Sequence, residues 1–212
     1  KASYGLTFTQ VGLITLTFQL TASLLQPWVG YHTDRHPKPW LLPAGTVCTL
    51  IGILMMSVVG SFPLILLAAA LIGIGSSTFH PEASRVARLA SGGRFGLAQS
   101  TFQVGGNAGS AFGPLLAAAI IIPFGQGNVA WFGLFAVFAL FVLYRISRWY
   151  ANHLNLFKLK AGQAATHGLS KGRVTSALVV LGLLVFSKYF YMASFTSYFT
   201  FYLIEKFDVS VA

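Results

Sequence analysis

The chain has 212 residues, of which 55% are hydrophobic and only 8% are charged. A soluble domain needs about a quarter of its residues charged to keep its surface wet, so this composition excludes an ordinary soluble protein. The formal net charge is +10, but the basic residues fall in short breaks between long apolar runs. A nucleic-acid binder gathers its basic residues on one face or along a groove. We therefore expect a membrane protein that has no nucleic-acid partner.

Six apolar segments are long enough to cross a bilayer as helices, which takes about 20 residues. In chain order they cover about 9–29, 40–60, 63–78 or slightly beyond, 97–122, 129–150 and 174–203. Their apolar runs are continuous rather than alternating, which favours helices over a β-barrel. The sequence therefore predicts an all-α membrane protein with six transmembrane helices.

Most of the lysines and arginines lie in alternate connections between these segments. They lie in 30–40, 80–96 and 145–173, whereas the turns at 61–63 and 123–128 carry no charge. Because cytoplasmic connections carry the excess of Lys and Arg, we expect the basic connections inside the cell and both ends of this sequence outside.

The stretch 151–173 is polar and has little hydrophobic periodicity. Such a composition is typical of a linker, so we predict a cytoplasmic linker here. It would separate a five-helix part in 1–150 from a part in 174–212 that contains one helix.

The sequence gives little support for a metal site or for enzymatic activity. Cys48 is the only cysteine, which excludes an internal disulfide and a zinc site of several cysteines. His80 and Glu82 have the His-x-Glu spacing of zinc deaminases, but no later pair of cysteines completes such a site. We expect no metal, no cofactor and no enzymatic activity, because no nucleophile or metal constellation is present.

The first basic connection begins at Gly30 and continues through Asp34 and Arg35 to Lys38. The glycine permits a tight exit from the preceding helix, and an acid followed by bases offers ion pairs at the cytoplasmic face. An ordinary basic loop is the alternative.

The fourth segment carries two rows of residues at helical spacing, one of small residues and one of polar residues. A row of small residues recurs every four positions and ends at a proline: Gly105, Gly109, Gly113 and Pro114. Such a row shares one helix face and lets another helix approach closely. Gln103 and Asn107 form a second row, and Gln19 belongs to a similar row in the first segment. Amides that faced lipid would lack partners, so we expect them to line a wet solute path; hydrogen bonds between helices are the alternative.

Of the four acidic residues, Glu82 lies closest to a position that we expect to be buried, and it stands near His80. Because a histidine titrates near neutral pH, the two residues are candidates for proton coupling. The alternative, which the residues alone favour, is an ion pair of Glu82 with Arg85 or Arg88 that closes the end of the helix.

Lys188 lies about 14 residues into the last segment, or roughly 21 Å along a helix. A central lysine costs about 2.5–3.5 kcal/mol on insertion scales and usually faces a cavity or a partner. Tyr191 and Tyr198 are spaced to share its face. An ammonium beside an aromatic path suits an anionic solute, whereas snorkelling of Lys188 to the membrane surface is the alternative.

Two of these motifs resemble signatures of the major facilitator superfamily. Residues 30–38 resemble its cytoplasmic loop signature, in outline Gly-x-x-x-Asp-Arg/Lys-x-Gly-Arg/Lys, with Pro37 where a glycine is usual. Residues 109–114 resemble its antiporter signature Gly-x-x-x-Gly-Pro-x-x-Gly-Gly, although Ala117 and Ala118 replace the last two glycines.

The resemblance implies a twelve-helix fold of which this sequence covers about helices two to seven. Residues 1–150 would then belong to the amino-terminal bundle, and 174–212 would contain helix seven, the first of the carboxy-terminal bundle. By the same resemblance, four residues form a conformational latch: Gly30, Asp34, Arg35 and Lys38.

The antiporter signature further implies export of a solute coupled to an inward flow of protons. The expected partners are a small anionic solute, protons and the lipid bilayer, and we expect a monomeric, multi-pass protein of the bacterial inner membrane. An importer or facilitator of small organic anions with the same fold is the alternative.

Overall fold

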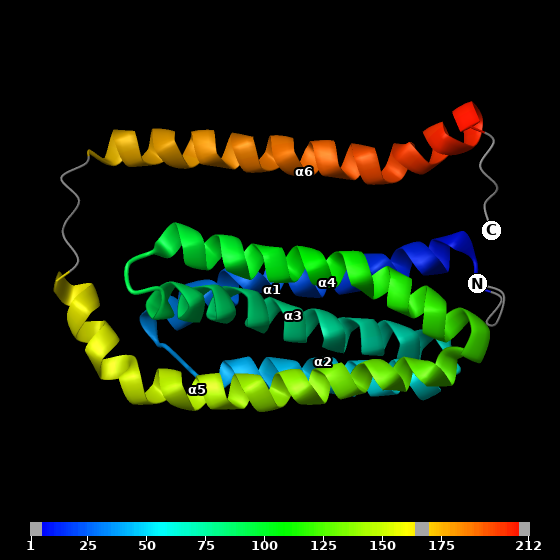
Figure 1. The fold of residues 1–212 in the computed structure, drawn as a ribbon, viewed down its shortest axis with the longest axis horizontal. Coiled ribbons are helices and arrows are strands. Elements are labelled where there is room, and N and C mark those ends of the chain that lie inside the picture. The colour runs from blue at the N-terminus through cyan, green and yellow to red at the C-terminus, as the bar shows by residue number, and fades with distance from the viewer. Residues whose placement is uncertain (1–5, 164–169, 208–212) are drawn as a thin grey trace. The chain divides into compact units, whose positions relative to one another are not determined.

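The computed structural model describes residues 6–163 and 170–207, and their regular structure is entirely helical (Figure 1). The elements in chain order are α1 (Phe8–Arg35), α2 (Leu41–Val58), α3 (Phe62–Ala90), α4 (Phe95–Phe124), the short 3₁₀ helix η1 (Gln126–Ala130), α5 (Trp131–Gln163) and α6 (Lys171–Phe207). The chain forms two compact units, Lys1–Ala161 with α1 to α5 and Gly162–Ala212 with α6. The all-α prediction is confirmed.

Within the described residues, five helical stretches are both long and apolar enough to cross a membrane. They are Leu41–Val58, Phe62–Ala90, Phe95–Phe124, Gln126–Leu154 and Lys171–Met192. Helix α1 has 28 residues, which at 1.5 Å per residue gives about 42 Å and is long enough to cross as well. Its threonines and glutamines make it more polar than the other five.

The helices extend past the apolar segments that the sequence predicts. Helix α1 continues to Arg35, so Gly30 does not end a helix as expected. Helix α3 runs through most of the expected loop 80–96 and ends at Ala90. Helix α5 continues to Gln163 and takes up the first part of the expected linker 151–173, of which 164–169 lie outside the described residues. Hydropathy marks where the lipid-facing run ends, but backbone hydrogen bonding continues for as long as good helix formers follow.

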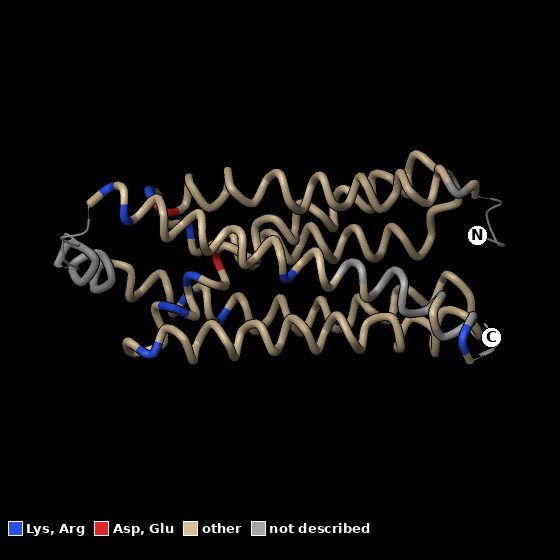
Figure 2. The backbone as a smooth tube through the Cα atoms, turned by 90° about the horizontal axis from the view of Figure 1, so that it is seen from above, with Lys and Arg blue, Asp and Glu red and all other residues tan. Residues whose placement is uncertain are grey.

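The two described basic connections of the five-helix unit lie at one end of it. Lysines and arginines gather toward that end in Figure 2. The connection between α3 and α4 is a tight turn at Gly92 and Gly93, whose φ angles are 60° and 94°. This left-handed region is open to glycine without strain, so the turn brings Arg88 and Arg94 to the same end of the bundle.

Helix α3 is the centre of the five-helix unit, because it packs closely on both α1 and α2. Glycines make the close approach possible. Gly73 faces Thr21 of α1, while Gly75 faces Gly45 and Thr49 of α2. A side chain at either α3 glycine would collide with backbone oxygen of the neighbouring helix. Small residues at contacts are a general means of packing helices in membranes, where burial of apolar surface provides no driving force.

Helix α5 is held against α2 and α3 by an apolar cluster and by polar contacts at both ends. Leu42, Val86 and Tyr150 form the buried centre of the cluster. At the basic end, the Ser147 hydroxyl donates to the carbonyl of Pro39 at 2.8 Å. At the other end, the Gln126 amide, just before α5, donates to the carbonyls of Met56 and Val59 at 2.7 and 3.0 Å.

We predict that Gly75→Ala destabilises the full-length protein. The added methyl group would collide with the Thr49 hydroxyl and the carbonyl of Gly45, and overpacking of this kind costs about 1–3 kcal/mol. Gly12→Ala is the matched control, because Gly12 is also helical and a methyl group there would meet no described neighbour within 4 Å. The midpoint of thermal unfolding of the purified protein in detergent measures both; equal midpoints for the two variants would contradict the packing.

Candidate functional site

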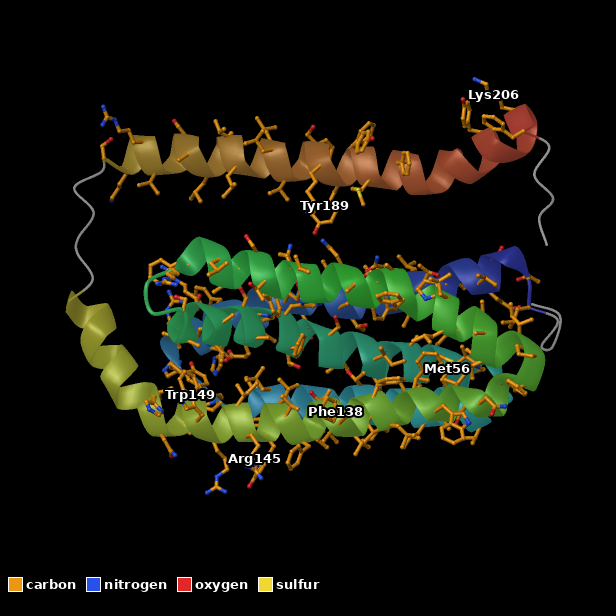
Figure 3. All side chains as sticks on the ribbon, in the orientation of Figure 1. Met56, Phe138, Arg145, Trp149, Tyr189 and Lys206 are labelled. Carbon is orange, nitrogen blue, oxygen red and sulfur yellow. The ribbon has the colours of Figure 1, made fainter. Side chains whose placement is uncertain are left out.

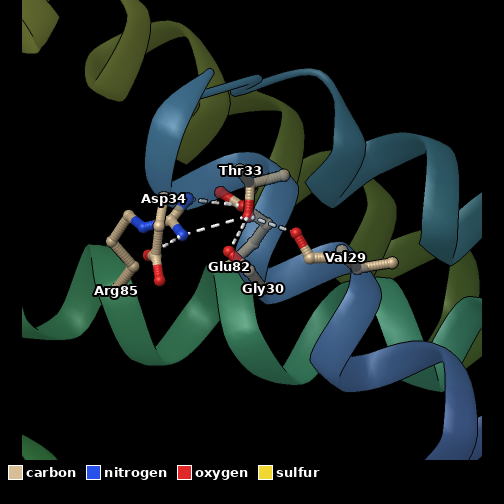
Figure 4. A network of polar contacts seen from close by, with 6 residues as sticks. All are labelled: Val29, Gly30, Thr33, Asp34, Glu82 and Arg85. Carbon is tan, nitrogen blue, oxygen red and sulfur yellow. Dashed lines mark hydrogen bonds and ion pairs between the residues drawn. The ribbon is translucent and has the colours of Figure 1, made fainter.

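The side chain of Arg85 joins α3 to α1 near the basic end of the bundle (Figure 4). Its Nη1 donates to Glu82 Oε1 at 2.7 Å, one turn earlier in α3. Its Nη2 donates to Asp34 Oδ1 of α1 at 2.5 Å and to Thr33 Oγ1 at 3.0 Å. One guanidinium therefore bridges two helices and two carboxylates, which suits the planar fork of arginine.

The two acids of this network differ sharply in exposure. The side chain of Glu82 is 0% exposed, that of Arg85 is 16% exposed, and that of Asp34 is 73% exposed. An exposed ion pair contributes only about 0–1 kcal/mol, whereas removing one partner of a buried pair costs about 3–5 kcal/mol. The Glu82–Arg85 half is thus the permanent part of the network, and the Asp34–Arg85 half can break at low cost.

Glu82 is not fully satisfied by Arg85. Its second oxygen, Oε2, has no hydrogen-bond partner among the described residues although it is buried. A buried carboxylate oxygen without a partner is costly.

Thr33 is a member of the network that sequence reasoning missed. Its side chain is fully buried, and its hydroxyl donates to the carbonyl of Val29 at 2.8 Å while it accepts from Arg85. The position before Asp34 carries no sequence signal of its own, because a threonine in a polar stretch is common and its burial depends on α3.

Gly30 lies inside α1 at the point where α1 approaches α3. A methyl group on Gly30 would lie 3.7 Å from Cβ of Pro81, which is an ordinary contact distance. Arg35 instead lies over the ring of Tyr31 at 3.6 Å from its centroid, and Lys38 accepts a backbone hydrogen bond from Leu41 at the start of α2. Of the four residues expected to form the latch, the structure thus brings Gly30 and Asp34 to α3.

His80 and Glu82 point in different directions from α3. Residues two apart on a helix are separated by about 200° around its axis. His80 is exposed, and its ring meets that of Phe102 in α4 at 6.5 Å between centroids. The Glu82–Arg85 ion pair, which the residues alone favoured, is confirmed, whereas Arg88 lies over the ring of Phe95 at 5.0 Å.

The residues expected along the solute path lie on exposed faces of three helices. Gln19 of α1 and Gln103 and Asn107 of α4 are all exposed in the five-helix unit. Lys188 and Tyr191 are exposed on α6, which belongs to the other unit. A path lined by all of them therefore stays a prediction.

The aromatic residues around Lys188 are arranged differently from the expectation. The ammonium of Lys188 lies 5.4 Å from the ring centre of its neighbour Tyr189, which is labelled in Figure 3. Tyr191 stacks on Phe195 instead, at 6.2 Å between centroids. The side chain of Tyr198 lies outside the described residues.

The small-residue row of α4 faces open space in the described structure. A methyl group at Gly105, Gly109 or Gly113 would meet no described neighbour within 4 Å, and Pro114 beside them is exposed. Their role in helix packing stays a prediction. The described glycines that lie closest to the backbone of a neighbouring helix are in α2 and α3, and their spacing forms no recognisable motif in the sequence.

A polar pocket of about 500 Å³ opens between α1, α3 and α4 beside the network. Asp34, Arg85 and Arg88 line it together with Ser84 and Gln99, and the Ser84 hydroxyl donates to the Gln99 side chain at 3.0 Å. No group of three metal-binding side chains comes together within the described residues. The described side chains of this site meet through ion pairs and hydrogen bonds.

Comparison with known proteins gives a consistent picture. The model of the Major Facilitator Superfamily matches residues 1–212. The fosmidomycin resistance protein of Escherichia coli (strain K12) is 58% identical over 211 residues, which are 100% of this chain and 52% of that protein. The uncharacterized MFS-type transporter YfnC of Bacillus subtilis (strain 168) is 41% identical over 215 residues, again 100% of this chain and 52% of the relative. The chain spans about half the length of these relatives, and no solved structure is significantly similar to it.

We predict that Arg85→Gln destabilises the full-length protein by about 3–5 kcal/mol, because it leaves the buried Glu82 carboxylate without its cation. The double variant Glu82→Gln/Arg85→Gln should recover most of this loss, since it removes the buried charge as well. Arg88→Gln is the control one turn later on α3 and should have little effect. Thermal unfolding of the purified proteins measures all three; a double variant that is no more stable than Arg85→Gln would contradict the pairing.

Proposed function

Because this chain belongs to the Major Facilitator Superfamily and is therefore part of a transporter, we propose that the full-length protein is a proton-coupled antiporter that exports fosmidomycin-like phosphonate antibiotics. The chain is a multi-pass membrane segment, and its relatives place it in the bacterial inner (plasma) membrane. The observation that carries the proposal is the 58% identity along the whole chain to the fosmidomycin resistance protein.

The negative charge of a phosphonate supports a role for Lys188 in the solute path. Lys188 is the one basic residue in the middle of α6, and its ammonium lies 5.4 Å from the Tyr189 ring. A cation in a lipid-facing position is costly, whereas a cation that meets an anionic solute is stabilised by it. Tyr191 and Tyr198 would extend the path along α6, and Gln19, Gln103 and Asn107 would line it from the five-helix unit.

Glu82 is the group that supports proton coupling. It is buried in the bundle with one oxygen unpaired, so it can carry a proton without breaking another hydrogen bond. When Glu82 is protonated, its attraction for Arg85 weakens, and the guanidinium can lean further toward Asp34. Proton uptake by Glu82 thereby strengthens the Asp34 side of the network at the expense of the Glu82 side. His80, the other candidate for proton coupling, is exposed on a different face of α3.

The Asp34–Arg85 pair supports a conformational latch at the basic end, which is cytoplasmic by the positive-inside rule. It joins α1 to α3 through the exposed side chain of Asp34 and the mostly buried side chain of Arg85. Such a pair can open and close at low cost, as alternating access requires. Gly30 lies where α1 approaches α3, and Arg35 and Lys38 supply the positive charge that keeps the loop inside.

We predict that inverted vesicles with the full-length protein accumulate fosmidomycin when the vesicle interior is acidified, and that a protonophore abolishes the accumulation. Vesicles without the protein are the control. Glu82→Gln should transport at the same rate with and without the gradient, because the amide cannot exchange a proton. Accumulation that is insensitive to the protonophore in the wild type would exclude antiport; uptake into right-side-out vesicles would favour the importer of organic anions.

We further predict that Lys188→Ala weakens fosmidomycin binding about tenfold or more, which is the loss expected for one charge-assisted hydrogen bond. Cells carrying it should lose resistance although the protein still reaches the membrane. Lys188→Arg keeps the charge and should retain resistance, and Lys171→Ala at the start of α6 is the control for a loss of charge alone. Full resistance in Lys188→Ala cells would remove this residue from the path.

A further inference from the structure

The polar pocket between α1, α3 and α4 contains an arginine that has no acidic partner among the described residues. Both ion pairs in this part of the chain belong to Arg85, whereas the guanidinium of Arg88 lies over the Phe95 ring, 5.0 Å from its centroid. Arg88 is exposed and lines the pocket. The other charged residues of the wall are Asp34 and Arg85, so the wall carries one positive charge in excess.

The donors of this pocket are placed so that one ligand can meet several of them. Arg85 and Arg88 are three residues apart on α3, a spacing that puts side chains next to each other on one face of a helix. The Gln99 side chain of α4 accepts from Ser84 at 3.0 Å and has its amide nitrogen as a further donor. Because a guanidinium binds phosphate-like oxygens through two parallel hydrogen bonds, the wall has the donors that a tetrahedral oxyanion needs.

The size and the rest of the wall suit a small organic molecule. The pocket has a volume of about 500 Å³, and sites for small molecules occupy about 300–1,000 Å³. Gly30, Pro81 and Phe95 supply the apolar part of the wall. A phosphonate has a charged head on a carbon chain, so a wall that is partly basic and partly apolar matches both of its ends.

Asp34 occupies one of the donors that such a ligand would use (Figure 4). Arg85 Nη2 donates to Asp34 and to Thr33, while Nη1 is held by the buried Glu82. The side chain of Asp34 is 73% exposed, so water replaces its hydrogen bonds at low cost when it leaves. An oxyanion in the pocket would therefore compete with Asp34 and leave the Glu82–Arg85 pair intact.

We propose that this pocket is the entry site for the phosphonate group of the solute, and that the bound phosphonate displaces Asp34 from Arg85. The proposal rests on the proposed function, in which the basic end is cytoplasmic and the Asp34–Arg85 pair is the latch. An arriving solute thereby opens the contact between α1 and α3. A phospholipid headgroup has the same oxyanion chemistry, and the experiment below distinguishes the two sources.

Binding of methylphosphonate to the purified full-length protein in detergent tests the site, with broadening of the phosphorus NMR signal as the measurement. Every protein carries Lys188→Ala, which removes the other cation proposed for the path. Adding Arg88→Gln should weaken binding about tenfold or more, the loss expected for one charge-assisted contact. Adding Arg94→Gln instead is the matched control, because Arg94 is an exposed arginine at the same end that lines a different pocket. Equal losses in both variants, or no binding to the Lys188→Ala protein, would overturn the proposal.

Two further measurements examine the displacement of Asp34 and the source of the oxyanion. Asp34→Asn should tighten methylphosphonate binding about threefold, because the exposed ion pair no longer has to break; unchanged or weaker binding would show that Asp34 does not compete. Phosphatidylglycerol added to the detergent micelles should leave methylphosphonate binding intact. Loss of that binding would assign the pocket to a lipid headgroup and overturn the entry site.

Transport in inverted vesicles, whose outer face is the cytoplasmic one, provides the second readout. Arg88→Gln alone should raise the KM for fosmidomycin and leave the maximal rate near that of the wild type, because it removes a contact made on entry. Arg94→Gln should leave both unchanged, and an unchanged KM in Arg88→Gln would contradict the entry site. If wild-type vesicles accumulate no fosmidomycin, the proposed function fails, whereas methylphosphonate binding still decides whether the pocket takes a phosphonate.

Discussion

The contact between α1 and α3 at the basic end depends on one buried pair, Glu82 with Arg85. A carboxylate that is fully withdrawn from water must be paired, so Glu82 holds the guanidinium inside the bundle. Only because it is held there does the guanidinium reach Thr33 and Asp34 on the neighbouring helix. The contact of Asp34 thus depends on the position of Arg85, and the position of Arg85 depends on Glu82.

The five-helix unit combines this adjustable contact with rigid ones. Toward the other end, α3 touches α1 and α2 through Gly73 and Gly75, where no side chain can be inserted. Packing of this kind resists displacement because any shift brings backbone atoms into collision. The Asp34–Arg85 ion pair at the basic end is not constrained in this way, because the side chain of Asp34 is exposed. In the proposed function, a helix fixed at one point and latched at another tilts when the latch opens, which is the kind of motion that alternating access requires.

Several parts of the site could not be predicted from the sequence, and the reasons are physical. The Glu82–Arg85 pair follows from helical spacing alone, since residues three apart are neighbours. The link from Arg85 to Asp34 crosses from α3 to α1, so it depends on how deeply the two helices approach each other. Thr33 has no motif around it and acquires its role only through burial. Gly105 and its neighbours have a clear motif, yet no described side chain packs on them.

The sequence by itself determined that this is an all-α membrane protein, because the length and continuity of its apolar runs leave no other way to satisfy the backbone in lipid. It also determined which end is basic and which family the loop and glycine motifs resemble. Only the tertiary structure decided which charges meet, how far α1, α3 and α5 continue beyond the apolar segments, and which glycines touch a neighbour. Those outcomes depend on distances between helices, and hydropathy along one chain carries no information about them.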